Sequence, residues 1–180
     1  MKELSLHILD LVENSVKAGA KLIEVNVVEK ISENIIYFEI KDNGCGMEAE
    51  FLKNVVNPFT TTRTTRKVGL GIPLTKLACE QAEGSFLIES TPGAGTYLKA
   101  AFMYDHIDRQ PLGDMKSTML MLITMREHTD FIYSHTVNDK DFKLDTRELK
   151  EILGGVSFNE PEVRNWLNDY LSENIESLYN

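Results

Sequence analysis

The stretch Ile40-Lys41-Asp42-Asn43-Gly44-Cys45-Gly46-Met47 decides how the rest of this chain is interpreted. An apolar-rich run, residues 35–40, ends there at a single carboxylate, and two glycines follow one residue apart. Such a turn can hold one acceptor rigidly at a strand end, while glycine lets the backbone pass close to a flat ligand. An ordinary hairpin is the alternative, because Asp-Asn-Gly is also strong turn chemistry. The neighbouring segments have to decide between the two.

The residues before this turn predict one helix and two strands. Apolar residues recur at helical spacing through residues 3–18, and Gly19 stands where a helix would stop. Residues 21–30 are rich in β-branched side chains and predict a strand. After a turn at 32–34, residues 35–41 predict a second strand, which we expect to be antiparallel to the first. A short helix over 48–55 follows the turn.

A basic, hydroxyl-rich segment lies at residues 57–67. It contains five threonines and three cations, and the only side chain in it that we expect to suit a core is Phe59. Cations and hydroxyl donors on a flexible chain are what a polyphosphate needs. A solvated loop without a ligand is the alternative.

A second Gly-x-Gly opens the next helix, which we expect over 73–83. Gly69-Leu70-Gly71 would leave unpaired N–H groups at the helix start, a favourable site for an anion. Pro73 fits in the first turn, where its missing N–H costs nothing. Gly84 ends this helix, and residues 85–90 and 96–104 predict an antiparallel pair of strands.

The composition changes after residue 104, so we expect a nucleotide-binding domain over 1–104 and a C-terminal extension over 105–180. Residues 105–113 read as a connector, and Asp114 can cap a helix to about 127, with a strand over 118–124 as the alternative. A hairpin over 131–144 with its turn at 138–141, a short helix from 145 or 146 to 153 and a helix from Pro161 to about 178 complete the extension. We expect this segment to pack on the sheet, bind a partner or form a homodimer, and these alternatives stay open.

The bulk composition limits the classes of protein to which the chain can belong. Its 180 residues are 42% hydrophobic and 26% charged, as in globular domains, and no apolar run reaches the length of a membrane span. The formal net charge of −9 argues against a general nucleic-acid binder, and the two cysteines suggest neither a disulfide framework nor a zinc site. We expect a cytoplasmic protein that neither binds nucleic acid nor inserts into a membrane.

Five motifs in a fixed order resemble the GHKL ATPases, the superfamily of gyrase-type topoisomerases, heat-shock chaperones, histidine kinases and mismatch-repair ATPases. The resemblance covers residues 4–103. Its motifs are an N box over 10–20, a first glycine box over 42–47, an F box over 58–62, a second glycine box over 69–72 and a terminal Gly-x-Gly-Thr within 90–96. This resemblance implies an α+β, two-layer sandwich of the Bergerat type, with helices on one face of a mixed, mainly antiparallel sheet.

The resemblance also implies roles for individual residues around ATP and Mg²⁺. Asp42 would accept a hydrogen bond from the adenine amine, Thr96 would support that contact, and Asn14 would give an amide oxygen to Mg²⁺. Lys17 could reach a phosphate or solvent. The remaining predicted nucleotide-binding residues come from the glycine boxes and the basic segment: Gly44, Gly46, Met47, Phe59, Thr60, Thr61, Thr62, Arg63, Arg66, Lys67, Gly69, Leu70 and Gly71.

Asp10 is the predicted catalytic residue. It precedes Asn14 by four residues, which places the two about 40° apart around a helix. In hydrolases and serine-directed kinases of the superfamily a Glu holds this position as general base; Asp keeps the carboxylate but has a shorter reach. Asp10 as an ordinary polar residue is the alternative. His7 lies on the same helix and lacks a phosphoacceptor pattern, so we expect no catalytic role for it.

Three features depart from the histidine-kinase pattern. Lys67 replaces the first glycine of the usual second box, Pro73 stands where Ser is common, and we expect no phosphoacceptor-histidine hairpin before the domain. Two functions therefore compete. The first is an enzyme that hydrolyses ATP or passes its γ-phosphate to a protein partner, and the second is a nucleotide-gated binding module with little or no turnover.

Overall fold

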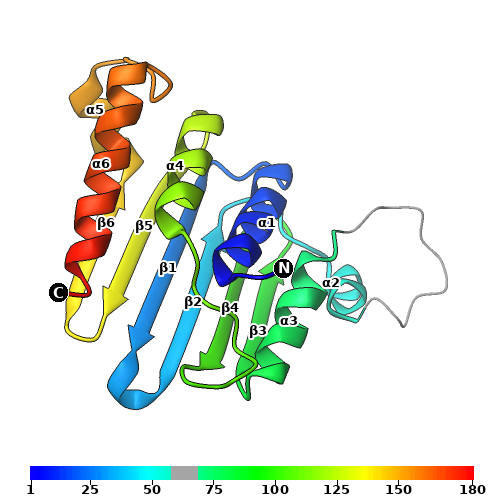
Figure 1. The fold of residues 1–180 in the computed structure, drawn as a ribbon. Helices are drawn as coiled ribbons and strands as arrows, with labels where there is room; N and C mark the ends of the chain where they lie inside the picture. Colours follow the sequence, from blue (N-terminus) through cyan, green and yellow to red (C-terminus); the bar gives the residue numbers. More distant parts are fainter. Residues whose placement is uncertain (58–68) are drawn as a thin grey trace.

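The computed structural model describes residues 1–57 and 69–180 of the chain. Six strands form one sheet in the order β3-β4-β2-β1-β5-β6 (Figure 1). The strands are β1 (Leu22–Lys30), β2 (Ile35–Asp42), β3 (Ser85–Thr91), β4 (Gly95–Met103), β5 (Asp130–Val137) and β6 (Lys140–Asp145). All neighbouring pairs are antiparallel except β1 and β5, which are parallel. The predicted mixed, mainly antiparallel sheet is confirmed.

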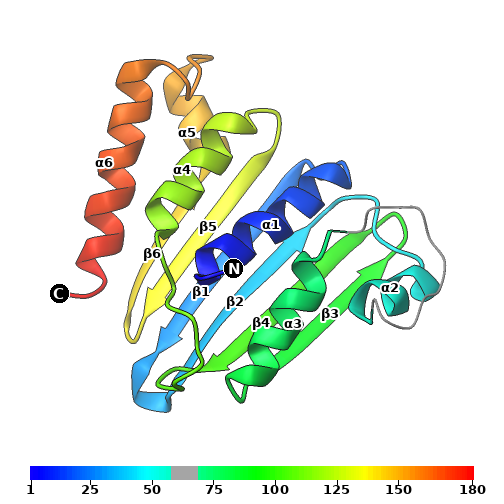
Figure 2. The same ribbon diagram turned by 45° about the vertical axis from the view of Figure 1, so that its right-hand side comes forward.

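Helices cover one face of this sheet, as predicted, and the other face carries none of the long helices (Figure 2). The helices are α1 (Leu4–Lys17), the short 3₁₀ helix η1 (Ile31–Glu33), α2 (Ala49–Val56), α3 (Gly71–Gln81), α4 (Met115–Met125), α5 (Thr146–Leu153) and α6 (Pro161–Ser177). Among the helices that the structure describes, none has both the length and the apolar character needed to span a bilayer.

The core lies between the helices and the covered face of the sheet because alternate strand residues point the same way. On β2 the buried residues are Ile36, Phe38, Ile40 and Asp42, so the carboxylate continues an apolar row. On α6 the inward residues Leu167 and Leu171 are fully buried. Asp42 therefore reaches the helix side of the sheet by strand periodicity alone.

Most predicted elements occur within two residues of their expected bounds, and three details differ. α3 begins at Gly71, two residues before the expected start, so Pro73 still lies in its first turn. The hairpin turn between β5 and β6 is shorter than expected, since only two residues separate the strands. The strand alternative over 118–124 is wrong, because Asp114 caps α4 by accepting a hydrogen bond from the Ser117 N–H.

Candidate nucleotide site

A cleft of about 420 Å³ opens beside α1, the Asp42 turn and the start of α3. Seven of the predicted binding residues line it: Asn14, Lys17, Asp42, Gly46, Met47, Gly69 and Thr96. The other lining residues are mostly apolar: Leu11, Ser15, Ala18, Ile40, Cys45, Phe51, Val55, Ile72, Ile88 and Leu98. An apolar cleft with few convergent polar groups is the usual form of a small-molecule site.

The Asp42 carboxylate is held by one hydrogen bond to each oxygen. Ser15 Oγ donates to Oδ2 at 2.6 Å, and the Gly44 N–H donates to Oδ1 at 2.9 Å. Asp42 is only 8% exposed, so these bonds offset part of the cost of burying a charge. A carboxylate has about four acceptor positions, so it keeps capacity for a donor that enters the cleft.

Thr96 lies beside Asp42 because the two residues are paired across β2 and β4. The Thr96 hydroxyl is 2.8 Å from Ser90 Oγ, which also accepts a hydrogen bond from the Met47 N–H at 2.8 Å. Ser90 thus joins the β3 and β4 strand ends to the turn that follows Asp42. The first glycine box and the terminal Gly-x-Gly-Thr, which are distant in the sequence, therefore form one wall of the cleft.

Gly44 and Gly46 are needed by the protein itself. A Cβ on Gly44 would lie 3.0 Å from the Cβ of Ala18, and one on Gly46 would lie 2.0 Å from the carbonyl oxygen of Thr91. Gly46 also has φ +68°, which larger residues rarely adopt. These glycines therefore let the turn pack between α1 and the β3–β4 turn. Their predicted passage over a base stays a prediction.

Asn14 and Lys17 belong to the last turn of α1 and line the cleft. Asn14 Oδ1 would lie 3.6 Å from a Cβ placed on Gly69, so the amide faces the segment that leads into α3. Leu70 is 63% exposed and caps α3 through its backbone. At 3.6 Å even a Cβ at position 69 would make only an ordinary contact, so Gly69 does not obstruct the Asn14 side chain.

Asp10 lies one turn before Asn14 and contacts the start of α3. A Cβ on Gly71 would lie 2.1 Å from Asp10 Oδ2, so the carboxylate packs against the bare Cα of that glycine. Gly71 is the first residue of α3, where unpaired N–H groups favour a nearby negative charge. Asp10 is half-buried and does not line the cleft in this conformation.

His7 is a buried structural residue between α1, α3 and the connector after β4. Its Nδ1 lies 2.9 Å from Thr75 Oγ1, and its Nε2 lies 2.7 Å from Gln110 Oε1. Thr75 Oγ1 donates in turn to the Gly71 carbonyl at 2.7 Å. Burial lowers the pKa of His7 below its ordinary value, while the hydrogen bond to Gln110 acts in the opposite direction.

The predicted contacts in the basic segment fall on residues 58–68, outside the residues that the structure describes. They are Phe59, Thr60, Thr61, Thr62, Arg63, Arg66 and Lys67. Their contacts with a nucleotide stay predictions from the sequence.

Ser15 and Ser90 are the site residues that sequence reasoning missed. Ser15 follows Asn14 directly and falls on the apolar stripe of α1, where a buried hydroxyl needs a partner. That requirement was the available signal. Ser90 gave no comparable signal, because its partners are contributed by Met47 and Thr96 from other parts of the chain.

The family is decided by comparison with known sequences. The profile of the histidine kinase-, DNA gyrase B- and HSP90-like ATPases matches residues 2–105, more than half of the chain. The chain belongs to this family. Its N box, both glycine boxes and the strands that carry them all fall within the matched residues, so the resemblance predicted from the motifs is confirmed.

Similar proteins of known sequence and structure agree with this assignment. The sensor histidine kinase YvrG of Bacillus subtilis is 29% identical over 52% of this chain, which spans only 17% of that kinase. The N-terminal domain of a DNA repair protein aligns with all of the chain and 57% of its own, with a TM-score of 0.57 and 15% identity. The ADP-bound ATPase domain of Aquifex aeolicus MutL aligns with 86% of this chain and 70% of its own, with a TM-score of 0.50 and 14% identity. These two structures confirm the GHKL fold.

Proposed function

We propose that this member of the ATPase family binds Mg²⁺-ATP in the cleft and hydrolyses its γ-phosphate or passes it to a protein partner. The observation that supports this most directly is the Asp42 carboxylate, held at both oxygens on a cleft wall. Because a fixed acceptor selects a donor, the amino group of adenine fits this position, whereas the carbonyl at the same place in guanine does not.

The cleft residues Asn14 and Lys17 have the chemistry that a metal-bound polyphosphate needs. Asn14 carries a hard oxygen ligand, and Mg²⁺ commonly takes only one or two protein ligands beside phosphates and water. The described residues hold no cluster of three or more His, Cys, Asp or Glu that could bind a metal without the nucleotide. We expect Asn14 to hold the ion; when bound, Mg²⁺ would neutralise charge on the β- and γ-phosphates. Lys17 and the predicted contacts Thr60, Arg63 and Lys67 would supply further donors.

Asp10 is the residue on which turnover depends in this proposal. As general base it would accept the proton of an attacking water or of a partner hydroxyl, which requires hydrogen-bond distance to the nucleophile. Positioning and charge stabilisation supply most of the remaining catalysis in phosphoryl transfer.

One observation favours a second function, a nucleotide-gated binding module with little turnover. The Asp10 carboxylate packs against Gly71 instead of lining the cleft. If it stays there when ATP is bound, no base reaches the γ-phosphate, and the nucleotide would only change how the protein presents itself to a partner.

Binding is tested with the variants Asp42→Asn and Ser15→Ala. We expect Asp42→Asn to weaken ATP binding by about 10- to 100-fold, since a hydrogen bond to a charged group is worth about 1.5–3 kcal/mol. Ser15→Ala should weaken it by only a few-fold, because the carboxylate remains. Titration calorimetry with ATP measures the affinity of both variants, and the same titration with GTP tests the preference for adenine. Unchanged ATP affinity in Asp42→Asn would disprove the proposed adenine contact.

Turnover is tested separately by γ-phosphate release from the wild type and Asp10→Asn, at ATP concentrations that saturate both. Phosphate release that disappears in Asp10→Asn while ATP affinity is kept would support the enzyme. Tight binding with no turnover in the wild type would favour the binding module. Release that is undiminished in Asp10→Asn would remove Asp10 as the base.

A further inference from the structure

β6 forms one edge of the sheet, and among the described strands none pairs with its outer side. In an antiparallel ladder every second residue directs its N–H and C=O away from the neighbour, so β6 presents unpaired backbone groups to solvent. Four of its six residues are charged: Lys140, Asp141, Lys143 and Asp145. Charge on an edge normally prevents pairing, unless the charges of the two edges complement each other.

The charges of β6 are complementary to those of a second β6. Asp141 and Lys143 are exposed on the face of the sheet away from the helices, and neither forms an ion pair with any residue that the structure describes. In a two-fold antiparallel pairing centred on Phe142, Asp141 of one copy lies opposite Lys143 of the other, and the arrangement occurs twice. Opposite charges that face each other across strands are stabilising.

Two alternative registers that keep both helix layers on the same side, those centred on Lys143 and on Leu144, are less favourable. A pairing centred on Lys143 places two lysines opposite each other and sets Asp141 against Asp145. A pairing centred on Leu144 places Lys143 opposite Asp145 of the other copy. This carboxylate already caps α5 and binds the Arg147 guanidinium at 2.7 Å, so it is not available to Lys143. Like charges directly opposite are destabilising, so the charge pattern selects the register centred on Phe142.

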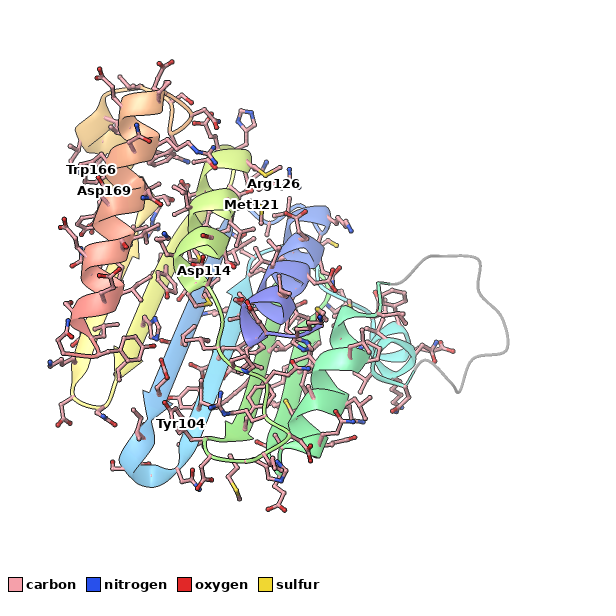
Figure 3. The ribbon with its side chains drawn as sticks, viewed as in Figure 1. Tyr104, Asp114, Met121, Arg126, Trp166 and Asp169 are labelled. Atoms are coloured by element: carbon pink, nitrogen blue, oxygen red, sulfur yellow. The ribbon has the colours of Figure 1, made fainter. Side chains whose placement is uncertain are left out.

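A row of aromatic side chains continues from this edge over α6. Phe142 packs edge-on against Tyr170 with ring centroids 5.7 Å apart, and Tyr170 stacks on Trp166 at 5.1 Å. Trp166 is 45% exposed, although it is a large apolar residue. Figure 3 shows Trp166 and Asp169 on α6, in the part of the molecule remote from α2 and α3. Exposed aromatic residues are typical of the centre of protein interfaces.

We propose that the outer edge of β6 is a dimerisation surface, on which a second copy of this chain pairs in the register centred on Phe142. The two sheets then continue as one, and the two α6 helices lie side by side with Trp166 and Tyr170 near the seam. The other sheet edge, β3, offers no such match, because its only charged residue is Glu89. The nucleotide cleft is not lined by residues of β6 or α6.

The experiment is sedimentation velocity over a concentration series, with charge-reversal variants of β6. We expect a concentration-dependent dimer for the wild type. Lys143→Asp should raise the dimer dissociation constant by about tenfold or more, because two attractive pairs become repulsive. The double variant Asp141→Lys with Lys143→Asp restores opposite charges across the two-fold axis and should restore the dimer. Glu89→Lys on the β3 edge is the matched control and should change nothing.

Trp166 supplies a second readout, since it is the only tryptophan. Acrylamide should quench its fluorescence less as the wild type dimerises, and Lys143→Asp should shift this change to about tenfold higher protein concentration or beyond. A wild type that stays monomeric throughout the series would overturn the proposal. So would a double variant that remains as monomeric as Lys143→Asp while circular dichroism shows it folded, or a dimer that only Glu89→Lys disrupts.

Discussion

The two cysteines differ in chemistry because of where each one lies. Cys45 is exposed at the cleft, whereas Cys79 is buried on α3. Burial raises the pKa of the Cys79 thiol to about 12, so almost none of it is the reactive thiolate near pH 8. We therefore expect one thiol of the native protein to react rapidly with a disulfide reagent, and Cys45→Ser to abolish that reaction.

The same reagent reports on occupancy of the cleft. ATP should slow the modification of Cys45, because a bound nucleotide would occupy the space that this residue lines. Asp42→Asn should remove the protection if Asp42 binds the base. Rapid modification of Cys45 in the presence of saturating ATP would contradict the proposed position of the nucleotide.

His7 links the folded state to pH through its burial. The folded protein holds this histidine at a pKa below its ordinary value of 6.5, so the unfolded chain takes up the proton first as pH falls. The contribution of His7 to stability is therefore complete above about pH 6.5 and is lost as pH falls from there toward the lowered pKa. Urea unfolding at several pH values should show a smaller loss of stability for His7→Gln than for the wild type across this window. His128→Gln, on an exposed histidine, is the control and should keep the wild-type dependence.

At the scale of elements, the contact between α1 and α3 depends on a missing side chain. A Cβ on Gly71 would overlap Asp10 Oδ2, at 2.1 Å, so Gly71→Ala should destabilise the protein by about 1–3 kcal/mol through overpacking. In an Asp10→Ala background the nearest remaining side-chain atom of residue 10 would be its Cβ, at 3.6 Å, an ordinary contact.

In this Asp10→Ala background, Gly71→Ala should leave the free energy of unfolding unchanged or raise it by about 0.5–1 kcal/mol, because Ala suits a helix better than Gly. A double-mutant cycle of unfolding free energies measures the coupling. Additive effects would show that Asp10 does not pack on α3 in solution.

Elements with strong local signals were predicted well, and those set by distant contacts were not. Alternation and β-branched residues identified β1 and β2, and Asp114 identified the start of α4. The start of α3 was misplaced because its first turn has no side-chain cap and packs on Asp10, which lies about 60 residues earlier. The same limit explains the site: Asp42 follows from strand and turn chemistry, whereas the contact of Ser90 with Thr96 appears only when the sheet forms.

For the whole molecule, the main surprise of the topology is the place of the C-terminal segment. β5 pairs in parallel with β1 along eight residue positions, although about 100 residues separate them in the chain. No local pattern encodes such a partner, since parallel strands are joined by a crossover connection of about a dozen residues or more and so are never adjacent in sequence. The parallel pair makes β1 an interior strand, so residues 130–145 extend the same sheet that carries the nucleotide cleft.

This shared sheet predicts that the chain unfolds as one unit. Leu171 is fully buried on α6, so Leu171→Ala should lower the free energy of unfolding by about 2–5 kcal/mol. Because β5 is paired with β1, we expect Leu171→Ala also to destabilise the strands that form the cleft in the other half of the sheet. Urea unfolding should then give coincident transitions from Trp166 fluorescence on α6 and from far-UV circular dichroism. In Leu171→Ala, the urea concentration at which half of the ATP is released should fall as far as the midpoints of these two transitions. If the Trp166 transition moved to lower urea while ATP binding and the remaining dichroism kept their wild-type midpoint, residues 105–180 would be an independently unfolding domain attached to the nucleotide-binding part.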